Sequence, residues 1–219
     1  MRQGTRDELL AHLAEAAGGL ALGHPTRVAV DGPPAAGKTT LADELAAVLR
    51  DRGRPVIRAT IDDFLHPRAQ RYRRGEYSAE GCYFDTHDNH ALNRLLLDPL
   101  GPGGDRRFQH AVYDHATDTV LSPPVTTAAA DAVLLFDGVF LLRPELIGRW
   151  DLRILVSTEL EKTVARAVIR ERADVARRWR ERYIPSQRLY FATVRPAEHA
   201  DFIVHNDEPQ RPAWETRAR

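Results

Sequence analysis

The stretch GPPAAGKTT (32–40) decides the fold, because it joins a strand-like apolar run, RVAVD (27–31), to a helix-like one, LADELAAVLR (41–50). It matches the phosphate-binding pattern G-x-x-x-x-G-K-[ST]. Glycines at both ends let backbone N–H groups turn inward, and the positive end of the following helix faces the same space. The pattern predicts that this loop holds a nucleotide through Gly32, Pro33, Pro34, Ala35, Ala36, Gly37, Lys38, Thr39 and Thr40.

The lysine of this loop stands out from the composition of the chain. Only two of the 31 basic residues are lysines, Lys38 and Lys162, and the rest are arginines. A lysine in an arginine-biased chain indicates a position that needs a compact ammonium group rather than a planar guanidinium. We expect Lys38 to reach the β- and γ-phosphates and to act in catalysis, and the Thr39 hydroxyl to bind Mg²⁺.

Further apolar, strand-like runs follow the loop, with helix-like segments between them. Continuous apolar strands that alternate with helices are typical of parallel strands buried on both faces. The sequence therefore predicts an α/β fold with a doubly wound, mainly parallel, five-stranded sheet. Its strands are expected at 28–31, 56–62, 132–137, 153–157 and 201–205, and its helices at 38–51, 86–97, 159–182 and 186–195, after a short opening helix with a capping box at Thr5 to Glu8.

We expect residues 1–219 to form a single domain, because no linker is long enough to divide the chain. Two substrate-side insertions are predicted, at about 63–85 and 98–131, and the second contains short runs that suit a small hairpin. A lid is predicted at about 166–185.

The bulk composition excludes several classes of protein. Basic and acidic residues cancel to a formal net charge of +0, which argues against nucleic acid or a membrane surface as partner. No apolar run approaches the ~20 residues that span a bilayer, and the charged first residues do not resemble a signal peptide. The single cysteine, Cys82, permits no internal disulfide. We expect a cytoplasmic protein with a small-molecule partner.

Two acidic positions follow strand-like runs and could lie at the ligand-binding edge of the sheet. Asp137 ends AVLLFD and could supply the carboxylate beside Mg²⁺, or could be an ordinary turn residue. Asp62 and Asp63 end VIRATIDD and could cap the strand, or one could take a proton from a substrate hydroxyl. We choose Asp62 as the base.

Together these motifs resemble the uridine kinase and phosphoribulokinase group of P-loop kinases. The resemblance covers roughly residues 27 to 206 and rests on GPPAAGKT, DDF, YFDTHD, VYD and LLFDGVFLLRPELIGRWDLRILV. It implies that Asp62 is the catalytic base, that Phe64 lies near the sugar, and that Asp137 takes the Mg²⁺-side position, where these kinases more often have glutamate.

The resemblance also implies residues for the acceptor. Asp85 of the Phe-Asp pair matches an aspartate that holds ribose hydroxyls, and Tyr113 of VYD matches an aromatic of the base pocket. Pyrimidine kinases typically place a histidine shortly after this segment, whereas VYDHATD has Asp118 there and His115 three residues earlier. The base specificity therefore stays open.

Lid arginines of the group contact the phosphates, and Arg166 and Arg170 occupy similar places. The arginine-rich segment 68–74 could address a phosphorylated or acidic substrate, or could be a solvated loop.

The sequence thus predicts a kinase that uses ATP and Mg²⁺ to phosphorylate a hydroxyl of a small molecule, with a nucleoside such as uridine or cytidine favoured. A nucleoside monophosphate, a sugar phosphate or another metabolite is the alternative acceptor. Rival classes are a P-loop ATPase switch and a nucleotide-binding regulator without catalysis. A homo-oligomer is compatible with the sequence.

Overall fold

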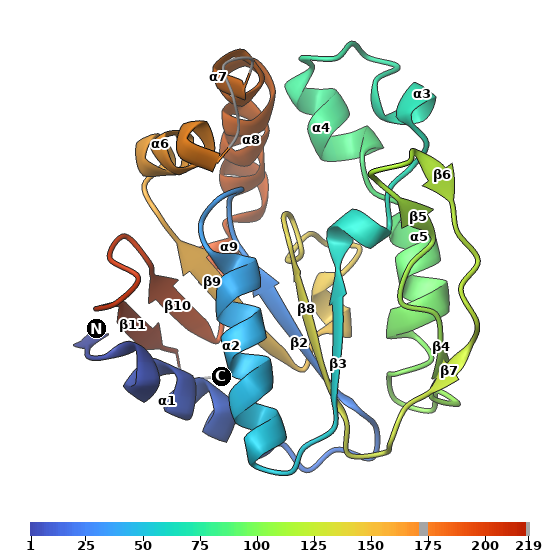
Figure 1. The fold of residues 1–219 in the computed structure, drawn as a ribbon, viewed down its shortest axis with the longest axis vertical. Helices are drawn as coiled ribbons and strands as arrows, with labels where there is room; N and C mark the ends of the chain where they lie inside the picture. The colour runs from blue at the N-terminus through green and yellow to red at the C-terminus, as the bar shows by residue number, and fades with distance from the viewer. Residues whose placement is uncertain (171–174, 218–219) are drawn as a thin grey trace.

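A seven-stranded mixed sheet forms the centre of the computed structural model, which describes residues 1–170 and 175–217 (Figure 1). Its strands, in spatial order, are β1 (Arg2–Gln3), β11 (Ala213–Thr216), β10 (Phe202–His205), β9 (Leu152–Ser157), β2 (Thr26–Asp31), β8 (Val133–Gly138) and β3 (Val56–Thr60). The five from β10 to β3 run parallel, while β11 runs antiparallel to both of its neighbours, β10 and β1.

The predicted α/β class and the parallel core are confirmed, but the predicted number of strands, five, is too small. The apolar runs of β2 and β8 are buried along their whole length, as parallel strands covered on both faces require. The two strands that were missed are an edge strand of two residues and the segment AWET. Neither carries an apolar run that would predict a buried strand.

Helices cover both faces of the sheet. One face packs against α1 (Arg6–Gly18) and α2 (Lys38–Asp51), which lie in front of the sheet in Figure 1. The other packs against α4 (Ala79–Asp85), α5 (Asn89–Leu92), the π-helical turn Asn93–Leu97, α8 (Ile184–Val194) and α9 (Pro196–His199). Because successive side chains of a strand point to opposite faces of the sheet, the strands contribute to two apolar clusters, one on each face.

The predicted opening helix and loop helix agree with the structure. Thr5 caps α1 with a complete capping box, and α2 spans 38–51 as expected. The helix predicted at 86–97 begins later, because the Asp88 side chain accepts from Ala91 N and starts α5 there. The segment predicted at 159–182 contains α6 (Leu160–Arg170), α7 (Val175–Arg178) and the π-helical turn Trp179–Tyr183.

Two small hairpin-like ladders form the turn-rich interval after residue 98. β5 (Tyr113–Asp114) pairs with β6 (Thr119–Val120), and β4 (Arg107–Phe108) pairs with β7 (Thr126–Thr127). The backbone N–H of Val112 donates to the carbonyl of Asp63, which ties this interval to the short 3₁₀ turn Ile61–Asp63 after β3. The insertion therefore lies beside the carboxyl end of β3.

The remaining short elements are α3 (Arg68–Arg71) and the 3₁₀ turn Ile147–Arg149. Within the described ranges, no helix is long and apolar enough to cross a membrane.

Candidate active site

The loop GPPAAGKTT lies between the end of β2 and the start of α2, and its backbone needs its glycines. Gly32 and Gly37 have positive φ angles of 150° and 91°. A Cβ on Gly32 would stand 2.3 Å from the carbonyl oxygen of Val156, and one on Gly37 would stand 2.5 Å from Asn206 Nδ2. Ala35 also has a positive φ, of 56°. This backbone shape is the anion-binding nest that the sequence pattern predicts.

Lys38 is the first residue of α2 and is almost completely buried. Its ammonium group donates to the carbonyl oxygen of Pro33 at 2.9 Å, so the side chain folds back over its own loop. Helix α2 has no side-chain cap at Gly37, and its first N–H groups point toward the loop. A lysine ammonium and a helix N-terminus together favour a bound anion.

Asp137 lies one residue before the end of β8 and is buried against the first turn of α2. It accepts a hydrogen bond from the Thr39 hydroxyl at 2.7 Å, so the two predicted metal ligands lie side by side. Carboxylate and hydroxyl oxygens suit Mg²⁺, which typically takes few protein ligands. Among the residues that the structure describes, no cluster of three or more His, Cys, Asp or Glu side chains could hold a metal.

The second oxygen of Asp137 has a partner that sequence reasoning missed. Arg58 of β3 donates Nη2 to Asp137 Oδ1 at 2.8 Å, Nη1 to the Leu135 carbonyl at 2.6 Å and Nε to Asp43 at 2.9 Å. Arg58 pairs in register beside Leu135 on the neighbouring strand. Its position within an apolar strand was the available signal, because a partly buried arginine needs acceptors.

Asp62 lies in the 3₁₀ turn that follows β3, with its side chain accessible to solvent. The surrounding protein nevertheless raises the pKa of its carboxyl by desolvation, and the charge of Asp137 adds to the shift. Lys38, His115 and Arg71 oppose it. The site thus gathers Asp62, the phosphate loop and the hairpin residue His115.

Asp31, the last residue of β2, is a second buried carboxylate that the sequence analysis did not single out. It accepts from the Tyr190 hydroxyl at 2.5 Å and from Leu141 N at 3.2 Å, and the same hydroxyl accepts from Leu142 N at 3.1 Å. Complete burial raises the pKa of Asp31, while these donors and Lys38 lower it. Asp31 therefore joins the base of the loop to α8.

Phe64 and Tyr113, two of the residues predicted to bind the acceptor, are both buried. Phe64 is fully buried and packs on Phe136, with ring centroids 6.1 Å apart. The Tyr113 ring is also buried, and its hydroxyl donates to Asp118. Asp118 accepts from Arg71 as well, at 2.8 Å, and the Tyr113 and Arg71 hydrogen bonds lower the pKa of its carboxyl.

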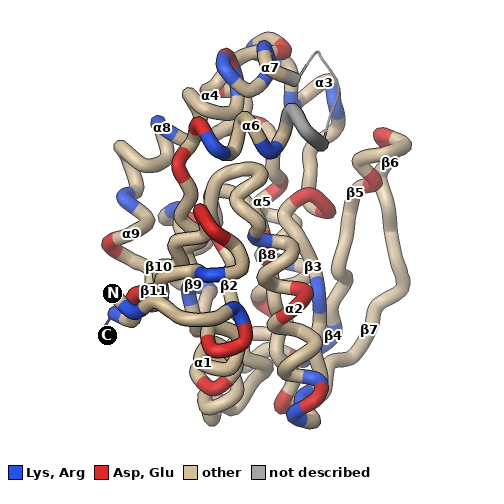
Figure 2. Tube along the Cα trace, turned by 60° about the vertical axis from the view of Figure 1, so that its left-hand side comes forward, with Lys and Arg blue, Asp and Glu red and all other residues tan. Residues whose placement is uncertain are grey.

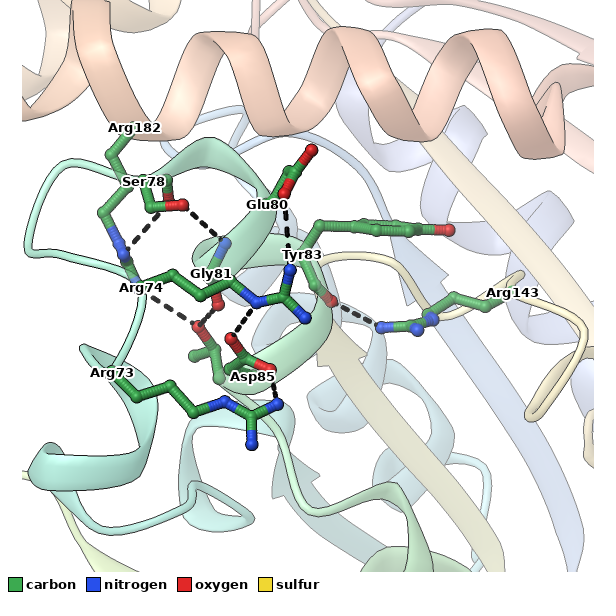
Figure 3. A network of polar contacts seen from close by, with 10 residues as sticks. Arg73, Arg74, Ser78, Glu80, Gly81, Tyr83, Asp85, Arg143 and Arg182 are labelled. Atoms are coloured by element: carbon green, nitrogen blue, oxygen red, sulfur yellow. Dashed lines mark hydrogen bonds and ion pairs between the residues drawn. The ribbon is translucent and has the colours of Figure 1, made fainter.

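Asp85, the predicted ribose-binding residue, is buried at the end of α4 between two arginines (Figure 3). Arg73 Nη2 lies 2.5 Å from one carboxylate oxygen, and Arg74 Nε lies 2.7 Å from the other. These hydrogen bonds lower the pKa of Asp85, with Arg73 the largest cause. The carboxylate is therefore charged and already paired.

Arg166, one of the two predicted lid arginines, lies beside the outer edge of the phosphate loop. It donates to the carbonyl oxygens of Asn206 at 2.8 Å and Asp207 at 3.0 Å. Asn206 in turn donates to the Ala36 carbonyl at 2.7 Å. The side chain of Arg170, the other predicted residue, lies outside what the structure describes.

A hollow of about 750 Å³ lies far from these residues, at the amino ends of β9 and β10. It is lined by Trp150, Asp151, Arg153, Asp201 and others, and its carboxylates already pair with Arg27 and Arg153. The candidate site lies at the opposite edge of the sheet, where ligands bind in open α/β folds.

The fold is similar to that of several solved structures described as small-molecule kinases. No family model matches the sequence, and no curated protein matches it in a sequence search. Solved structures do match. A possible uridine kinase from Bacillus stearothermophilus superposes with a TM-score of 0.72 and 24% identity, over 90% of this chain and 97% of that one.

Two further kinases share the fold. A candidate fructose transport system kinase from Silicibacter sp. TM1040 has a TM-score of 0.68 and 24% identity, over 84% of this chain and 94% of that one. D-glycerate 3-kinase from Cryptococcus neoformans var. grubii has a TM-score of 0.67 and 13% identity, over 98% of this chain and 100% of that one. The resemblance drawn from the sequence is thus confirmed for the fold.

Proposed function

We propose that this protein is a kinase that uses ATP and Mg²⁺ to phosphorylate a hydroxyl of a small molecule. One observation carries the proposal: Asp62 lies in the turn directly after β3, where Thr60 pairs in register with Asp137 and donates its hydroxyl to the Asp137 carbonyl at 3.0 Å. A base beside a phosphate loop and a metal-binding carboxylate is the arrangement that phosphoryl transfer to an alcohol needs. The kinases of the same fold support the reaction class.

The reaction uses each group for a separate task. The loop N–H groups and Lys38 bind the phosphates of ATP, and Thr39 and Asp137 hold Mg²⁺, which neutralises phosphate charge when bound. Asp62 accepts the proton of the acceptor hydroxyl while its oxygen bonds to the γ-phosphorus and the bond to ADP breaks. The raised pKa of Asp62 makes its ionised carboxylate a better proton acceptor than an ordinary aspartate.

For the acceptor, the proposal names a favoured class of small molecule and its alternatives rather than one compound. A nucleoside such as uridine or cytidine is the acceptor that the sequence motifs favour. A nucleoside monophosphate, a sugar phosphate or another small metabolite is the alternative, because Asp118 and Asp85 are engaged by arginines. Arg166 and Arg170 are proposed to act on the phosphates from the lid.

The test measures ADP release from ATP and Mg²⁺ with and without acceptors, for the wild type and for Asp62→Asn. Asparagine keeps the shape and removes the base, so we expect kcat to fall by about 10²- to 10⁴-fold while nucleotide affinity is kept.

Asp63→Asn is the matched control, because it neutralises the neighbouring carboxylate in the same turn. The kcat of this variant should stay within several-fold of the wild-type value. Equal losses in the two variants would remove Asp62 from its role, and ADP release independent of any acceptor would favour an ATPase instead.

A further inference from the structure

Four arginines lie within seven residues on the acceptor side of the site: Arg68, Arg71, Arg73 and Arg74. They belong to α3 and the turn after it, beyond the carboxyl edge of the sheet (Figure 1). Figure 2 shows basic residues at α3, whereas basic and acidic residues are mixed around α6 and α7. The role of this local positive charge depends on which negatively charged groups contact it.

The strongest contact of this segment is a clasp that Arg73 and Arg74 form around Asp85 (Figure 3). Each carboxylate oxygen is occupied by a different guanidinium, and the carboxylate is only 2% exposed. Each oxygen can accept a further hydrogen bond, but the buried carboxylate offers almost no surface to the hydroxyls of a neutral sugar. In this arrangement, Asp85 instead orients two cations.

Both guanidinium groups keep donors for a ligand. A guanidinium has five N–H donors in a fixed plane. Arg73 uses Nη2 for Asp85, and Arg74 uses Nε for Asp85 and Nη1 for a long contact of 3.3 Å with Glu80. The side chains are 58% and 42% exposed, so their remaining N–H groups are accessible. Oriented donors on adjacent arginines match the oxygens of a carboxylate or phosphate.

The clasp lies next to the reacting region. Thr86, the residue after Asp85, accepts from His66 N at 3.0 Å, and Asp88 N donates to the Phe64 carbonyl at 2.8 Å. These hydrogen bonds fix the end of α4 against the segment that directly follows Asp62. A small molecule that presents its hydroxyl to Asp62 can therefore extend toward Arg73 and Arg74.

Two further buried arginines, Arg71 and Arg182, lie in this part of the structure. Arg182 is 2% exposed, and within the described part of the chain it donates to neutral oxygens, the carbonyls of Glu76 and Ser78 and the hydroxyl of Thr86. Arg71 is buried too; its Nη2 pairs with Asp118, while its Nε has no hydrogen-bond partner among the described residues. A buried cation such as Arg182, whose described hydrogen bonds reach no carboxylate, favours a ligand that brings negative charge.

We propose that the phosphate acceptor carries an acidic group, a carboxylate or a phosphate, and that Arg73 and Arg74 bind this group with Asp85 as their positioning residue. This inference rests on the proposed kinase function and narrows its acceptor class. It assigns specificity to the charge of the acceptor at a point away from the reacting hydroxyl.

The experiment compares acceptors that differ only by an acidic group and keep a free hydroxyl. The pairs are uridine and orotidine, glycerol and D-glycerate, and fructose and fructose 6-phosphate. ADP release gives kcat and KM for each with the wild type and with Arg73→Gln. Arg94→Gln is the control, since Arg94 is exposed on the π-helical turn away from the clasp.

We expect the wild type to prefer the acidic member of at least one pair by tenfold or more in kcat/KM. Arg73→Gln should raise KM for that member roughly 10- to 100-fold, with little change in kcat or in the neutral member, as loss of a charged hydrogen bond predicts. Arg74→Gln should act in the same way, and circular dichroism checks that each variant folds.

Two results would overturn the inference. One is a wild type that uses neutral acceptors as well as or better than acidic ones, which leaves the kinase function standing. The other is a variant that changes KM equally for both members of a pair, which makes the clasp a purely structural feature. Absence of acceptor-dependent ADP release with every compound would count against the kinase function and the inference together.

Discussion

The substitution Tyr190→Phe tests how the hydrogen bond between Tyr190 and Asp31 stabilises the end of β2, from which the phosphate loop begins. The substitution removes one hydroxyl and leaves the ring, so it opens no cavity. Two hydrogen bonds disappear, the 2.5 Å bond to the Asp31 carboxylate and the 3.1 Å bond from Leu142 N. Asp31 and Tyr190 are 0% exposed, so water does not replace the hydroxyl.

The expected loss follows from these two contacts. A hydrogen bond to a charged group contributes about 1.5–3 kcal/mol, and an orphaned buried donor costs about 1–3 kcal/mol. We expect Tyr190→Phe to lower the free energy of unfolding by about 3 kcal/mol. The pKa of Asp31 should rise further, because the Tyr190 hydrogen bond is the largest influence that lowers it.

Urea unfolding followed by circular dichroism measures the loss. Tyr183→Phe is the matched control, because the hydroxyl of Tyr183 makes no hydrogen bond with the described part of the chain, and it should stay within about 0.5 kcal/mol of the wild type. A double-mutant cycle with Asp31→Asn should give a coupling energy of about 1 kcal/mol or more. A Tyr190→Phe protein as stable as the control would refute this account.

Two further predictions concern the loop and the acceptor side. Gly37→Ala places a Cβ 2.5 Å from Asn206 Nδ2 at a φ of 91°. It should lower the free energy of unfolding by about 1–3 kcal/mol and weaken ATP binding, which calorimetry measures. The control Gly148→Ala, whose Cβ would have no atom within 4 Å, should change neither quantity. Burial, and secondarily Arg143 and other cations, lowers the pKa of His87 to about 3 from 6.5, so the unfolded state binds the extra proton and stability falls as pH drops from 6.5 toward 3. His87→Gln should flatten that fall by up to about 1.4 kcal/mol per pH unit in urea titrations, and an unchanged slope would contradict the assignment.

The fold could be predicted where the signal was local. The loop motif, the capping box at Thr5 and the apolar runs of the parallel strands each lie within about ten residues, and all appear in the structure. The strands β1 and β11 could not be predicted, because two residues and a short polar segment carry no period. β11 pairs with the open edge of β10, and β1 then pairs with β11.

The site could be predicted in part for the same reason. The structure brings Thr39 and Asp137 within 2.7 Å of one another, although they are 98 residues apart, because parallel strands end at a common edge. No pattern in the sequence links Asp31 to Tyr190, which are 159 residues apart.

The clasp of Asp85 illustrates the remaining limit. The sequence shows both the arginines and the aspartate, but only their placement shows that Arg73 and Arg74 occupy both carboxylate oxygens. A role inferred for Asp85 by resemblance, toward sugar hydroxyls, therefore stays a prediction that competes with the acidic acceptor proposed above.

The central claim is that the γ-phosphate moves to a hydroxyl of a small molecule. The most direct measurement follows γ-³²P-labelled ATP with Mg²⁺ and the six acceptors named above, and separates the labelled products. The account predicts label in a phosphorylated acceptor, with little free phosphate formed when the acceptor is left out. Label that passes only to water, at a rate indifferent to every acceptor, would contradict it.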